Sequence, residues 1–390
     1  MPCKETDTRK SDGCPTKVMI VAGEASGDLH GSLLVREMLG INPGLEFHGI
    51  GGTKMRQAGV QLLADAKDIG VVGVTEALAK LRIFIKIISG IKKSMDLLKP
   101  ALVILIDFPD FNLNIVAPAA KKRGIPVFYY ISPQVWAWRK GRVKQIKKLI
   151  DSMAVILPFE VDFYASYGYT VQYVGHPLAD QVKSSFTPQA ARGEFGLAEA
   201  APTIGLLPGS RSAEVSRLLP EMIKAARIIS ARMPEAQYII PLADTLRQES
   251  VRGLIAGAGI DVKIVSGRIY DVLAACDLAI VTSGTATLEA GLIGVPMVIV
   301  YKMSVLSALI GKLIINPEFI GLVNIIAGKS VAPELIQLNA TGRRIASEAL
   351  GILLDSDRKL KMIHELKNIR EKLGEPGAAR KAAQIACNMI

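Results

Sequence analysis

The sequence has no long apolar run, few cysteines and no metal-type spacing of ligands, and each shortage excludes a class of protein. No apolar stretch reaches the roughly 18 residues that a membrane-spanning helix needs. The first residues, MPCKETDTRKSDGCPT, lack the apolar centre of a signal peptide. We therefore expect a cytoplasmic protein with a disordered polar leader over residues 1–16.

The cysteines are too few and too scattered to staple a fold or to hold a metal. They are Cys3, Cys14, Cys276 and Cys387, and no pair shows the spacing of metal ligands. Neither a disulfide framework nor a metal centre is expected.

What the chain has in quantity is hydrophobic residues and positive charge. Of 390 residues, 50% are hydrophobic and 21% charged, which is typical of a folded protein long enough for two domains. The formal net charge of +11 favours an acidic partner: nucleic acid, a phosphorylated substrate or an anionic membrane. The basic stretch 139–148, which follows Trp136 and Trp138, has no interleaved aromatic residues, so nucleic-acid binding gains little support. This basic patch could hold a phosphate or a membrane surface, and a solvated basic helix face is the usual alternative.

Residues 203–226, TIGLLPGSRSAEVSRLLPEMIKAA, contain the clearest candidate for a ligand-binding turn. An apolar strand is broken by Pro208 and Gly209, and Ser210 is predicted to cap the amphipathic helix that follows. A helix N-terminus attracts phosphate, and Arg211 can add a two-pronged contact. The alternative is an ordinary turn with a surface arginine.

A second turn of this kind lies later in the same half of the chain. The strand 277–281 leads to Ser283, Gly284 and Thr285, which open another helix suited to phosphate. Glu289 lies farther along that helix, where its carboxylate can accept hydrogen bonds from ribose hydroxyls.

The first strand, residues 17–22, runs into the turn GEASGD. Its glycines allow a tight turn close to a ligand, and Ser26 or Asp28 can cap the next helix. Glu24 is harder to explain as a cap. A plain strand-to-helix turn and a ligand-facing loop both fit this pattern.

Asp107 is the candidate general base. It follows the nearly all-apolar strand 101–106, whose carboxyl end should face the ligand crevice of an open α/β sheet. Desolvation there would raise the pKa of Asp107 and make it a useful base. A structural aspartate remains the alternative, and Asp110 can cap the helix that begins near Phe111.

Residues 71–98 form a strongly apolar helix interrupted by lysines. Over 78–93 this pattern fits either a helix that contacts a membrane surface or acyl chains, or a buried helix whose lysines extend to water.

Strands and helices alternate through the whole chain, which predicts an α/β protein with parallel sheets. We place a first domain at 17–178, a linker at 179–201 where polar and Ala-rich residues gather, and a second domain at 202–390 that ends in covering helices.

Taken together, the motifs resemble the lipid-A-disaccharide synthase family. The resemblance covers nearly the whole chain after the leader, in the family's order: VAGEASGD (21–28), DFPDFN (107–112), SPQVWAWR (132–139), LPFE (157–160), VGHPLAD (174–180), LPGSRSAE (207–214), SGTATLE (283–289) and NIIAGK (324–329).

The resemblance implies a GT-B fold, with two Rossmann-like α/β/α domains facing a cleft. It implies an inverting transfer from UDP-2,3-diacylglucosamine to 2,3-diacylglucosamine 1-phosphate (lipid X), which gives a β-1,6 disaccharide 1-phosphate and UDP. Asp107 then becomes the base and Arg211 the group that stabilises the leaving diphosphate. The implied substrate-binding residues are Glu24, Ser26, Gly27, Asp28, Gly209, Ser210, Arg211, Ser283, Gly284, Thr285, Glu289 and Asn324.

No metal or other cofactor is expected, because two helix N-termini and Arg211 can neutralise the diphosphate. The resemblance also implies peripheral contact of residues 78–93 with the inner membrane, and it suggests a homodimer.

Two kinds of rival interpretation remain. One is another UDP-sugar enzyme of the same fold, such as the peptidoglycan N-acetylglucosaminyltransferase or a UDP-sugar epimerase. The other is a non-catalytic module that binds anionic membranes. The long apolar stretch and SPQVWAWR argue against the first, and the presence of Asp107, Arg211 and Glu289 within their motifs argues against the second.

Overall fold

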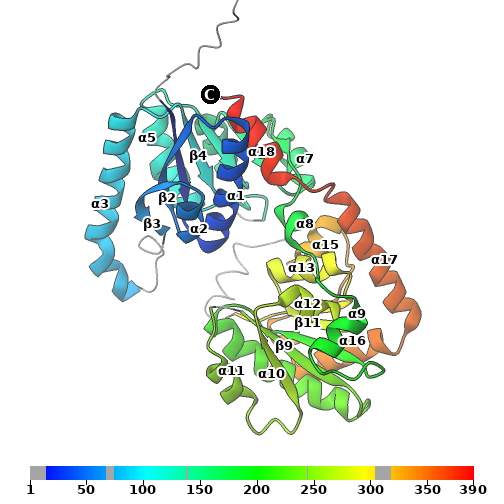
Figure 1. Cartoon of the computed structure of the whole chain (residues 1–390). Coiled ribbons are helices and arrows are strands. Elements are labelled where there is room, and N and C mark those ends of the chain that lie inside the picture. The colour runs from blue at the N-terminus through cyan, green and yellow to red at the C-terminus, as the bar shows by residue number, and fades with distance from the viewer. Residues whose placement is uncertain (1–14, 67–73, 138, 244, 304–317) are drawn as a thin grey trace, which may run out of the picture.

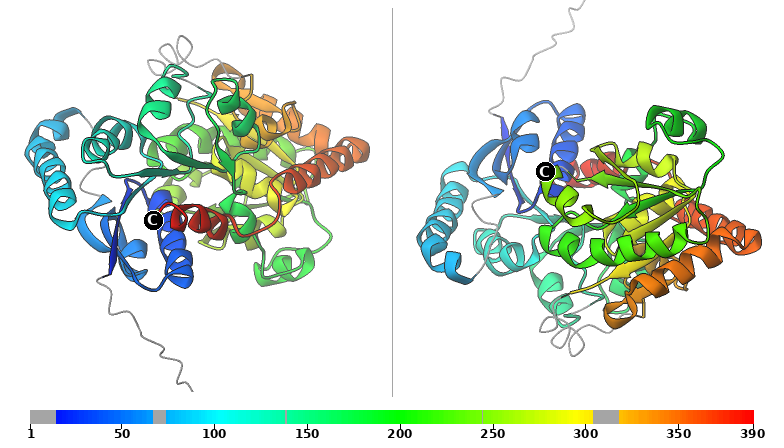
Figure 2. Two further views of the ribbon diagram at one scale, coloured as in Figure 1. Left: turned by 90° about the horizontal axis from the view of Figure 1, so that it is seen from above. Right: turned by 90° about the horizontal axis from the view of Figure 1, so that it is seen from below.

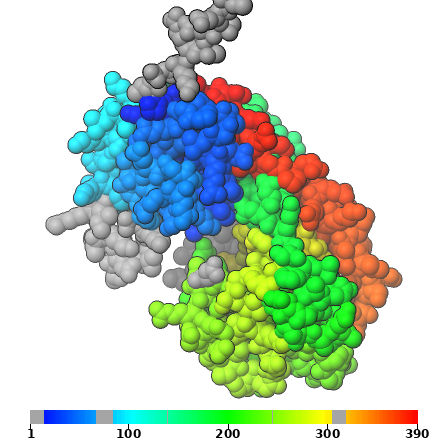
Figure 3. Space-filling model, in the orientation of Figure 1, coloured from blue at the N-terminus to red at the C-terminus, as the bar shows by residue number. Residues whose placement is uncertain are grey.

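The computed structural model describes residues 15–66, 74–137, 139–243, 245–303 and 318–390, with the backbone alone for 74–83. Nearly all of the predicted leader, and the side chains at 78–83 of the predicted membrane-contacting stretch, lie outside the described residues. The chain forms two α/β bodies joined along one side (Figures 1 and 3). No helix among the described residues has the length and apolar character to cross a membrane.

The first body is built on a parallel sheet with the strand order β3-β2-β1-β4-β5-β6-β7. Its central strands are apolar on both faces and fully buried, because helices cover the sheet on both sides. The strands are β1 (Thr16–Ala22), β2 (Leu45–Gly51), β3 (Gln61–Asp65), β4 (Leu102–Ile106), β5 (Val127–Tyr130), β6 (Ser152–Val155) and β7 (Gln172–Tyr173).

Helices pack on this sheet wherever their sequence presents an apolar face. In α3, Ile91 and Met95 are buried against the sheet, whereas Ile85 and Leu97 are exposed. The helices are α1 (Ala25–Ile41), α2 (Thr53–Gln57), α3 (Val74–Leu98), α4 (Pro109–Phe111), the π-helix η2 (Asn112–Val116), α5 (Ala117–Lys121), α6 (Arg142–Leu149) and α7 (Phe159–Ala165).

A short connecting segment carries α8 (Pro177–Gln181) and α9 (Pro188–Glu194) to the second body. His176 begins α8, where its Nδ1 accepts a hydrogen bond of 3.1 Å from the backbone N–H of Leu178. Its side chain therefore caps α8.

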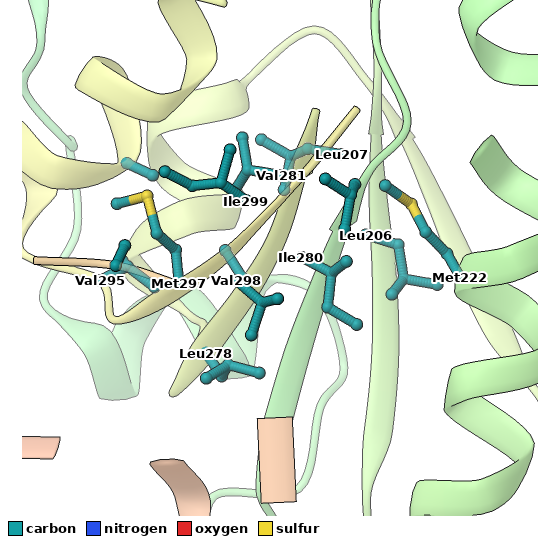
Figure 4. Packing of buried hydrophobic residues seen from close by; sticks show 14 of the residues in the cluster. Leu206, Leu207, Met222, Leu278, Ile280, Val281, Val295, Met297, Val298 and Ile299 are labelled. Atoms are coloured by element: carbon teal, nitrogen blue, oxygen red, sulfur yellow. The ribbon is translucent and has the colours of Figure 1, made fainter. Parts of the chain in front are cut away.

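The second body repeats the plan, with the parallel order β10-β9-β8-β11-β12-β13. Leu206, Ile280 and Val298 come from three neighbouring strands and pack with Met222 of α10 (Figure 4). The strands are β8 (Thr203–Leu207), β9 (Gln237–Leu242), β10 (Val262–Ser266), β11 (Leu278–Thr282), β12 (Met297–Tyr301) and β13 (Glu334–Ile336). The helices are α10 (Ser212–Ser230), α11 (Gln248–Ile255), α12 (Ile269–Ala274), α13 (Thr285–Ile293), α15 (Leu322–Ala327), α16 (Gly342–Leu353), α17 (Ser356–Lys372) and α18 (Ala378–Cys387).

The last helix, α18, does not stay with the second body. It returns to the first, where Ala382, Ala383 and Ala386 are buried in the same apolar cluster as residues of α1 (Figures 1 and 2). The chain passes between the bodies twice, near residue 180 and near residue 375, and hydrogen bonds join these two segments. Tyr173 donates to the carbonyl of Leu373 at 2.7 Å, and Asp180 accepts from the N–H of Gly377 at 2.6 Å. The boundary drawn at residue 202 stays a prediction, but residues 378–390 pack with the first body.

Each sheet has one point where the chain order reverses direction: between β1 and β4 in the first, and between β8 and β11 in the second. Loops at the carboxyl ends of such strands diverge and leave a crevice for a ligand. The turns after these four strands contain Glu24, Asp107, Arg211 and Ser283, all of which the sequence singles out.

Candidate active site

A cavity of about 580 Å³ opens at the reversal point of the second sheet. It is bounded by the carboxyl ends of β8, β9 and β11 and by the turns that follow them and β10. The lining includes seven of the residues predicted to bind substrate: Gly209, Ser210, Arg211, Ser283, Gly284, Thr285 and Glu289. The structure therefore brings both phosphate-type turns together around one space.

The turn after β8 exposes the start of a long helix to this cavity. Gly209 has φ of 109°, and a Cβ there would come within 2.5 Å of Glu214 Oε2, so glycine is required. The predicted cap by Ser210 is wrong: α10 begins at Ser212, Arg211 is its N-cap, and no side chain caps it. Ser210 instead accepts a hydrogen bond from Thr245 Oγ1 through its carbonyl, at 2.6 Å.

Arg211 is held loosely beside the cavity. Its Nη1 donates to Glu214 Oε1 at 3.2 Å, but 78% of the side chain is exposed. An exposed pair of this kind contributes little stability, so the guanidinium can exchange its partner for an anion at little cost.

The turn after β11 has the same character. Gly284 is the N-cap of α13, and no side chain caps this helix either. Ser283 donates its hydroxyl to the carbonyl of Ile320 at 2.8 Å, and Thr287 accepts from the N–H of Leu322 at 3.1 Å. These bonds hold residues 320–322 against the turn, whereas Thr285 is exposed.

Glu289 lies in the cavity wall one turn farther along α13. Burial raises the pKa of its carboxyl, and the hydroxyl of Tyr270, which donates to Oε1 at 3.1 Å, opposes that rise. Tyr270 fixes the orientation of the carboxylate, which can then accept hydrogen bonds from vicinal hydroxyls of a ligand.

Thr282, the last residue of β11, is a lining residue that the sequence does not single out. Its side chain is buried, and among the described residues its hydroxyl has no hydrogen-bond partner. A buried hydroxyl without a partner is costly. Only its place at the strand's carboxyl end could have identified it, because it reads as part of an apolar strand.

Asn324 does not line this cavity, and the structure gives its side chain another task. Its Oδ1 accepts from the N–H groups of Val331 and Ala332 at 2.8 and 2.9 Å, and its Nδ2 donates to the carbonyl of Ala332 and to Glu334. Glu334 in turn accepts from the N–H groups at 320 and 321. Asn324 thus supports the loop that Ser283 contacts, and substrate binding by Asn324 stays a prediction without support from these contacts.

In the first body, Asp107 follows β4 at the reversal point. Asp107 and Phe108 both have left-handed backbones, with φ of 44° and 49°. The turn is held because the carbonyl of Asp107 accepts hydrogen bonds from Asn112 Nδ2 at 2.7 Å and from the Tyr129 hydroxyl at 2.6 Å. Backbone strain of this kind is concentrated at functional sites.

The carboxyl of Asp107 is poised to exchange a proton near neutral pH. Burial raises its pKa to about 6, the Glu24 carboxylate adds to the rise, and the N–H of Phe108 opposes it. Glu24 is the exposed N-cap of α1, directly after β1, so the two carboxylates flank the reversal point. A group with this pKa is an effective base at neutral pH.

In the turn after β1, one of the other predicted substrate-binding residues is exposed and the rest are packed against the fold. Ser26 is exposed, whereas Gly27 is buried where a Cβ would come within 3.2 Å of Ala22. Neither Ser26 nor Asp28 caps α1, contrary to prediction.

Asp28 instead caps the neighbouring helix α2. Its carboxylate accepts hydrogen bonds from the N–H groups of Gly52, Lys54 and Met55 at 2.7 to 3.0 Å. A substrate contact by Asp28 therefore stays a prediction, because its oxygens already have these partners. Asp110, likewise, does not cap α4 but pairs with Arg139, in the loop before α6, and with Arg142 of α6.

Within the described part of the chain, no three His, Cys, Asp or Glu side chains gather as a metal site requires. Positive charge around the cavity comes from Arg211 and Arg268 and from the two helix N-termini, which favour phosphate oxygens.

Two α/β bodies, each built on a parallel sheet with one reversal point, have the architecture of the GT-B class. Solved structures of that class are similar in fold. The UDP-GlcNAc 2-epimerase from Neisseria meningitidis bound to UDP-GlcNAc superposes with a TM-score of 0.60 at 13% identity, covering 96% of this chain and 99% of that one. MurG from Acinetobacter baumannii gives 0.60 at 16% identity, covering 96% and 100%. At these identities the likeness shows the fold alone.

Sequence comparison identifies the family. The family model described as lipid-A-disaccharide synthetase matches residues 18–389. The lipid-A-disaccharide synthase of Syntrophus aciditrophicus (strain SB) is 54% identical over 374 residues, covering 96% of this chain and 97% of that protein. That of Nitrosococcus oceani is 48% identical over 373 residues, covering 96% of both. The chain belongs to the lipid-A-disaccharide synthase family and is a glycosyltransferase.

Proposed function

We propose that this enzyme transfers 2,3-diacylglucosamine from UDP-2,3-diacylglucosamine to the 6-hydroxyl of 2,3-diacylglucosamine 1-phosphate (lipid X). The products are the β-1,6-linked disaccharide 1-phosphate and UDP. Family membership supports a UDP-sugar donor and a lipid acceptor. The observation that carries the proposal is the pairing of a phosphate-type cavity in one domain with the raised-pKa carboxyl of Asp107 in the other.

The donor's diphosphate binds between the two uncapped helix N-termini. Backbone N–H groups at the starts of α10 and α13 donate to its oxygens, and Arg211 leaves Glu214 to join them. Ser210, Ser283 and Thr285 flank the diphosphate. Glu289, oriented by Tyr270, accepts the ribose hydroxyls.

The reaction is a single displacement. The Asp107 carboxylate takes the proton from the acceptor's 6-hydroxyl as that oxygen attacks C1 of the donor sugar from the face opposite UDP. The bond from C1 to the diphosphate oxygen breaks, UDP leaves with the electron pair, and the configuration at C1 inverts. Arg211 and the helix N-termini stabilise the charge that develops on the leaving group.

Helix α3 carries the contact with the inner membrane. Among its described side chains, Ile85 is 57% exposed and Leu97 71% exposed, and Lys86, Lys92 and Lys93 lie on the exposed surface. Exposed apolar residues beside lysines suit a surface of anionic lipid. Sedimentation with anionic and with neutral vesicles tests this contact. The wild type should bind anionic vesicles, and Lys92→Glu should bind them more weakly.

The homodimer suggested by the family resemblance is also part of this proposal. Light scattering on the purified protein, over a range of concentrations, tests it: a mass of twice 41.9 kDa is expected, and a constant monomer mass would contradict it.

Product analysis tests the reaction itself. The enzyme is incubated with both substrates in neutral detergent, and the lipid product is identified by mass and by the configuration of its new bond. A β-linked disaccharide phosphate that forms only with both substrates supports the proposal. Turnover of UDP-N-acetylglucosamine, with no product from the diacylated pair, would instead favour the rival UDP-sugar enzymes. Inactivity with both kinds of substrate, while UDP still binds, would contradict the proposed reaction and the rival enzymes alike.

A further inference from the structure

The backbone at the candidate base adopts a conformation that other parts of the structure must hold. Asp107 and Phe108 lie in the left-handed region, with φ of 44° and 49°, and a bulky residue such as phenylalanine rarely does so. Such conformations persist only where the surrounding structure fixes them. The contacts of this turn therefore show what keeps the base in place.

Two buried side chains bind the same backbone atom of the turn, the carbonyl oxygen of Asp107. Tyr129 of β5, the strand beside β4, donates its hydroxyl at 2.6 Å. Asn112, the first residue of η2, donates its Nδ2 at 2.7 Å, and its backbone N–H donates to the carbonyl of Phe108 at 3.1 Å. Both residues are 0% exposed, so water does not compete for these bonds.

The amide of Asn112 serves this carbonyl at a cost in stability. Its Nδ2 also approaches the carbonyl of Ile106 at 3.4 Å, but its Oδ1 is buried, and within the described part of the chain no donor reaches it. A buried acceptor without a partner is unfavourable. Local costs of this kind are expected at functional positions.

The hydroxyl of Tyr129 stays protonated over the pH range in which Asp107 titrates. Burial raises the pKa of Tyr129 well above its ordinary value of 10, and the neighbouring Asp107 and Tyr164 add to the rise, whereas Asn112 and Arg142 oppose it. The tyrosine therefore remains a hydrogen-bond donor to the turn whether the base is ionised or not.

The ring of Phe108 closes the turn on its other side. It lies over Gly23, where a Cβ would clash with the ring, and it packs on Phe111 with the ring centroids 5.4 Å apart. The carboxyl of Asp107 is thus kept partly buried. Burial is the main cause of its raised pKa, and the charge of Glu24, next to Gly23, is the second.

We propose that Tyr129 and Asn112 are positioning residues of the reaction, which hold the carboxyl of Asp107 at the reversal point by fixing its carbonyl. The inference rests on the proposed function, because it takes Asp107 to be the base. When either bond is lost, the turn relaxes and the carboxyl moves toward solvent. The carboxylate then lies farther from the acceptor hydroxyl, and its pKa falls because it is less buried.

Tyr129→Phe is the direct test, because it removes one bond and keeps the ring in the core. At pH 8 we expect kcat to fall about 10-fold, as a misplaced base implies, with the donor KM and the UDP affinity within about twofold of the wild type. The acid limb of the pH profile should move to lower pH. Asn112→Ala should act in the same direction, and Tyr129→Phe suffices if Asn112→Ala does not fold.

Tyr169→Phe is the matched control. The hydroxyl of Tyr169 donates to the carbonyl of Ile150 at 3.0 Å, which is the same kind of bond in the same body. Its loss should leave kcat and the acid limb unchanged. An equal fall of kcat in Tyr129→Phe and Tyr169→Phe would show an effect of general stability and overturn the inference.

A second test removes the base itself. In the Asp107→Asn background, Tyr129→Phe should lower the residual rate by less than about twofold, because no carboxylate is left to position. A further loss of about 10-fold in that background would overturn the inference, as would an unmoved acid limb in Tyr129→Phe. Asp107→Asn with the wild-type rate would instead overturn the proposed role of the base, so the two failures are distinguishable.

Discussion

At the scale of single residues, the proposed reaction depends most on the ionisation of Asp107. Burial and the charge of Glu24 hold the pKa of its carboxyl at about 6, so the base is half ionised at that pH and mostly protonated below it. We predict that kcat/KM falls about tenfold per pH unit below this pKa and levels off above it. Glu24→Gln removes the repulsive charge and should move the acid limb to lower pH. Glu37→Gln, a carboxylate farther along α1, should not, and an unmoved limb in Glu24→Gln would contradict the coupling.

The same raised pKa fixes the sign of a stability effect. The folded state binds the Asp107 proton more tightly than the unfolded chain, whose ordinary value is 3.8. The resulting stabilisation is present below that value and is lost as the pH rises through about 6. We predict that Asp107→Asn melts at a higher temperature than the wild type at pH 8, and that the difference shrinks toward pH 4. A lower melting temperature at pH 8 would show that the fold stabilises the ionised carboxylate, which contradicts a raised pKa.

Thr282 allows a test of the donor cavity that stability alone cannot mimic. Its buried hydroxyl has no partner among the described residues, so Thr282→Val removes an unsatisfied group while keeping the shape. We predict unchanged or increased stability together with UDP affinity weakened about 5- to 10-fold, as the loss of one hydrogen bond implies. Calorimetric titration with UDP measures this. Thr203→Val, at the end of β8 away from the cavity, is the comparison, and unchanged UDP affinity in Thr282→Val would remove Thr282 from the site.

At the scale of elements, Asn324 stabilises the loop that contacts Ser283 in the turn after β11. Four hydrogen bonds of 2.8 to 2.9 Å join its buried amide to residues 331–334. We predict that Asn324→Ala lowers the free energy of unfolding by about 2–4 kcal/mol, because its partners stay buried without bonds. Asn339→Ala, at an exposed position, should change it by less than about 0.5 kcal/mol. Lost activity at unchanged stability would instead support the predicted contact of Asn324 with substrate.

The elements themselves were largely predictable from the sequence, because apolar runs and helical periodicity are local. The apolar strand predicted before Pro208 spans Thr203–Leu207, and the amphipathic helix predicted after it spans Ser212–Ser230. Capping was not predictable, since a capping side chain can serve a different helix. Asp28 caps α2 from α1, and Ser210 leaves α10 uncapped. The short edge strands β3 and β13 were also missed, because edge strands need little apolar sequence.

The site was predictable in part for the same reason. Motif residues that follow a strand, such as Arg211 and Ser283, do gather at the carboxyl edge of one sheet. The sequence did not predict the features that depend on contacts between residues far apart in the chain. Thr282 looks like one more strand residue, and the convergence of Arg139 and Arg142 on Asp110 requires β4 and β5 to be neighbours.

At the scale of the whole molecule, the C-terminal helix joins the two bodies. The amphipathic sequence of α18 predicts that one face of the helix is buried but does not identify the element that covers it. In the structure that element is α1. We predict that Ala383→Asp lowers the free energy of unfolding by about 3 kcal/mol or more, because it buries an unpaired charge. Gln384→Asp, on the exposed face of the same helix, should cost little. Hydrogen exchange should show the loss of protection in α1 rather than in α10, and equal loss in both would contradict this docking.

The central claim is that the two bodies act together: the second binds the UDP-sugar while Asp107 of the first deprotonates the acceptor. It is tested most directly by UDP release from UDP-2,3-diacylglucosamine, with and without 2,3-diacylglucosamine 1-phosphate, in the wild type and in Asp107→Asn. We predict release that requires the acceptor in the wild type and falls by about 10²- to 10⁴-fold in the variant, with unchanged UDP affinity. Release at the wild-type rate in Asp107→Asn would contradict the claim.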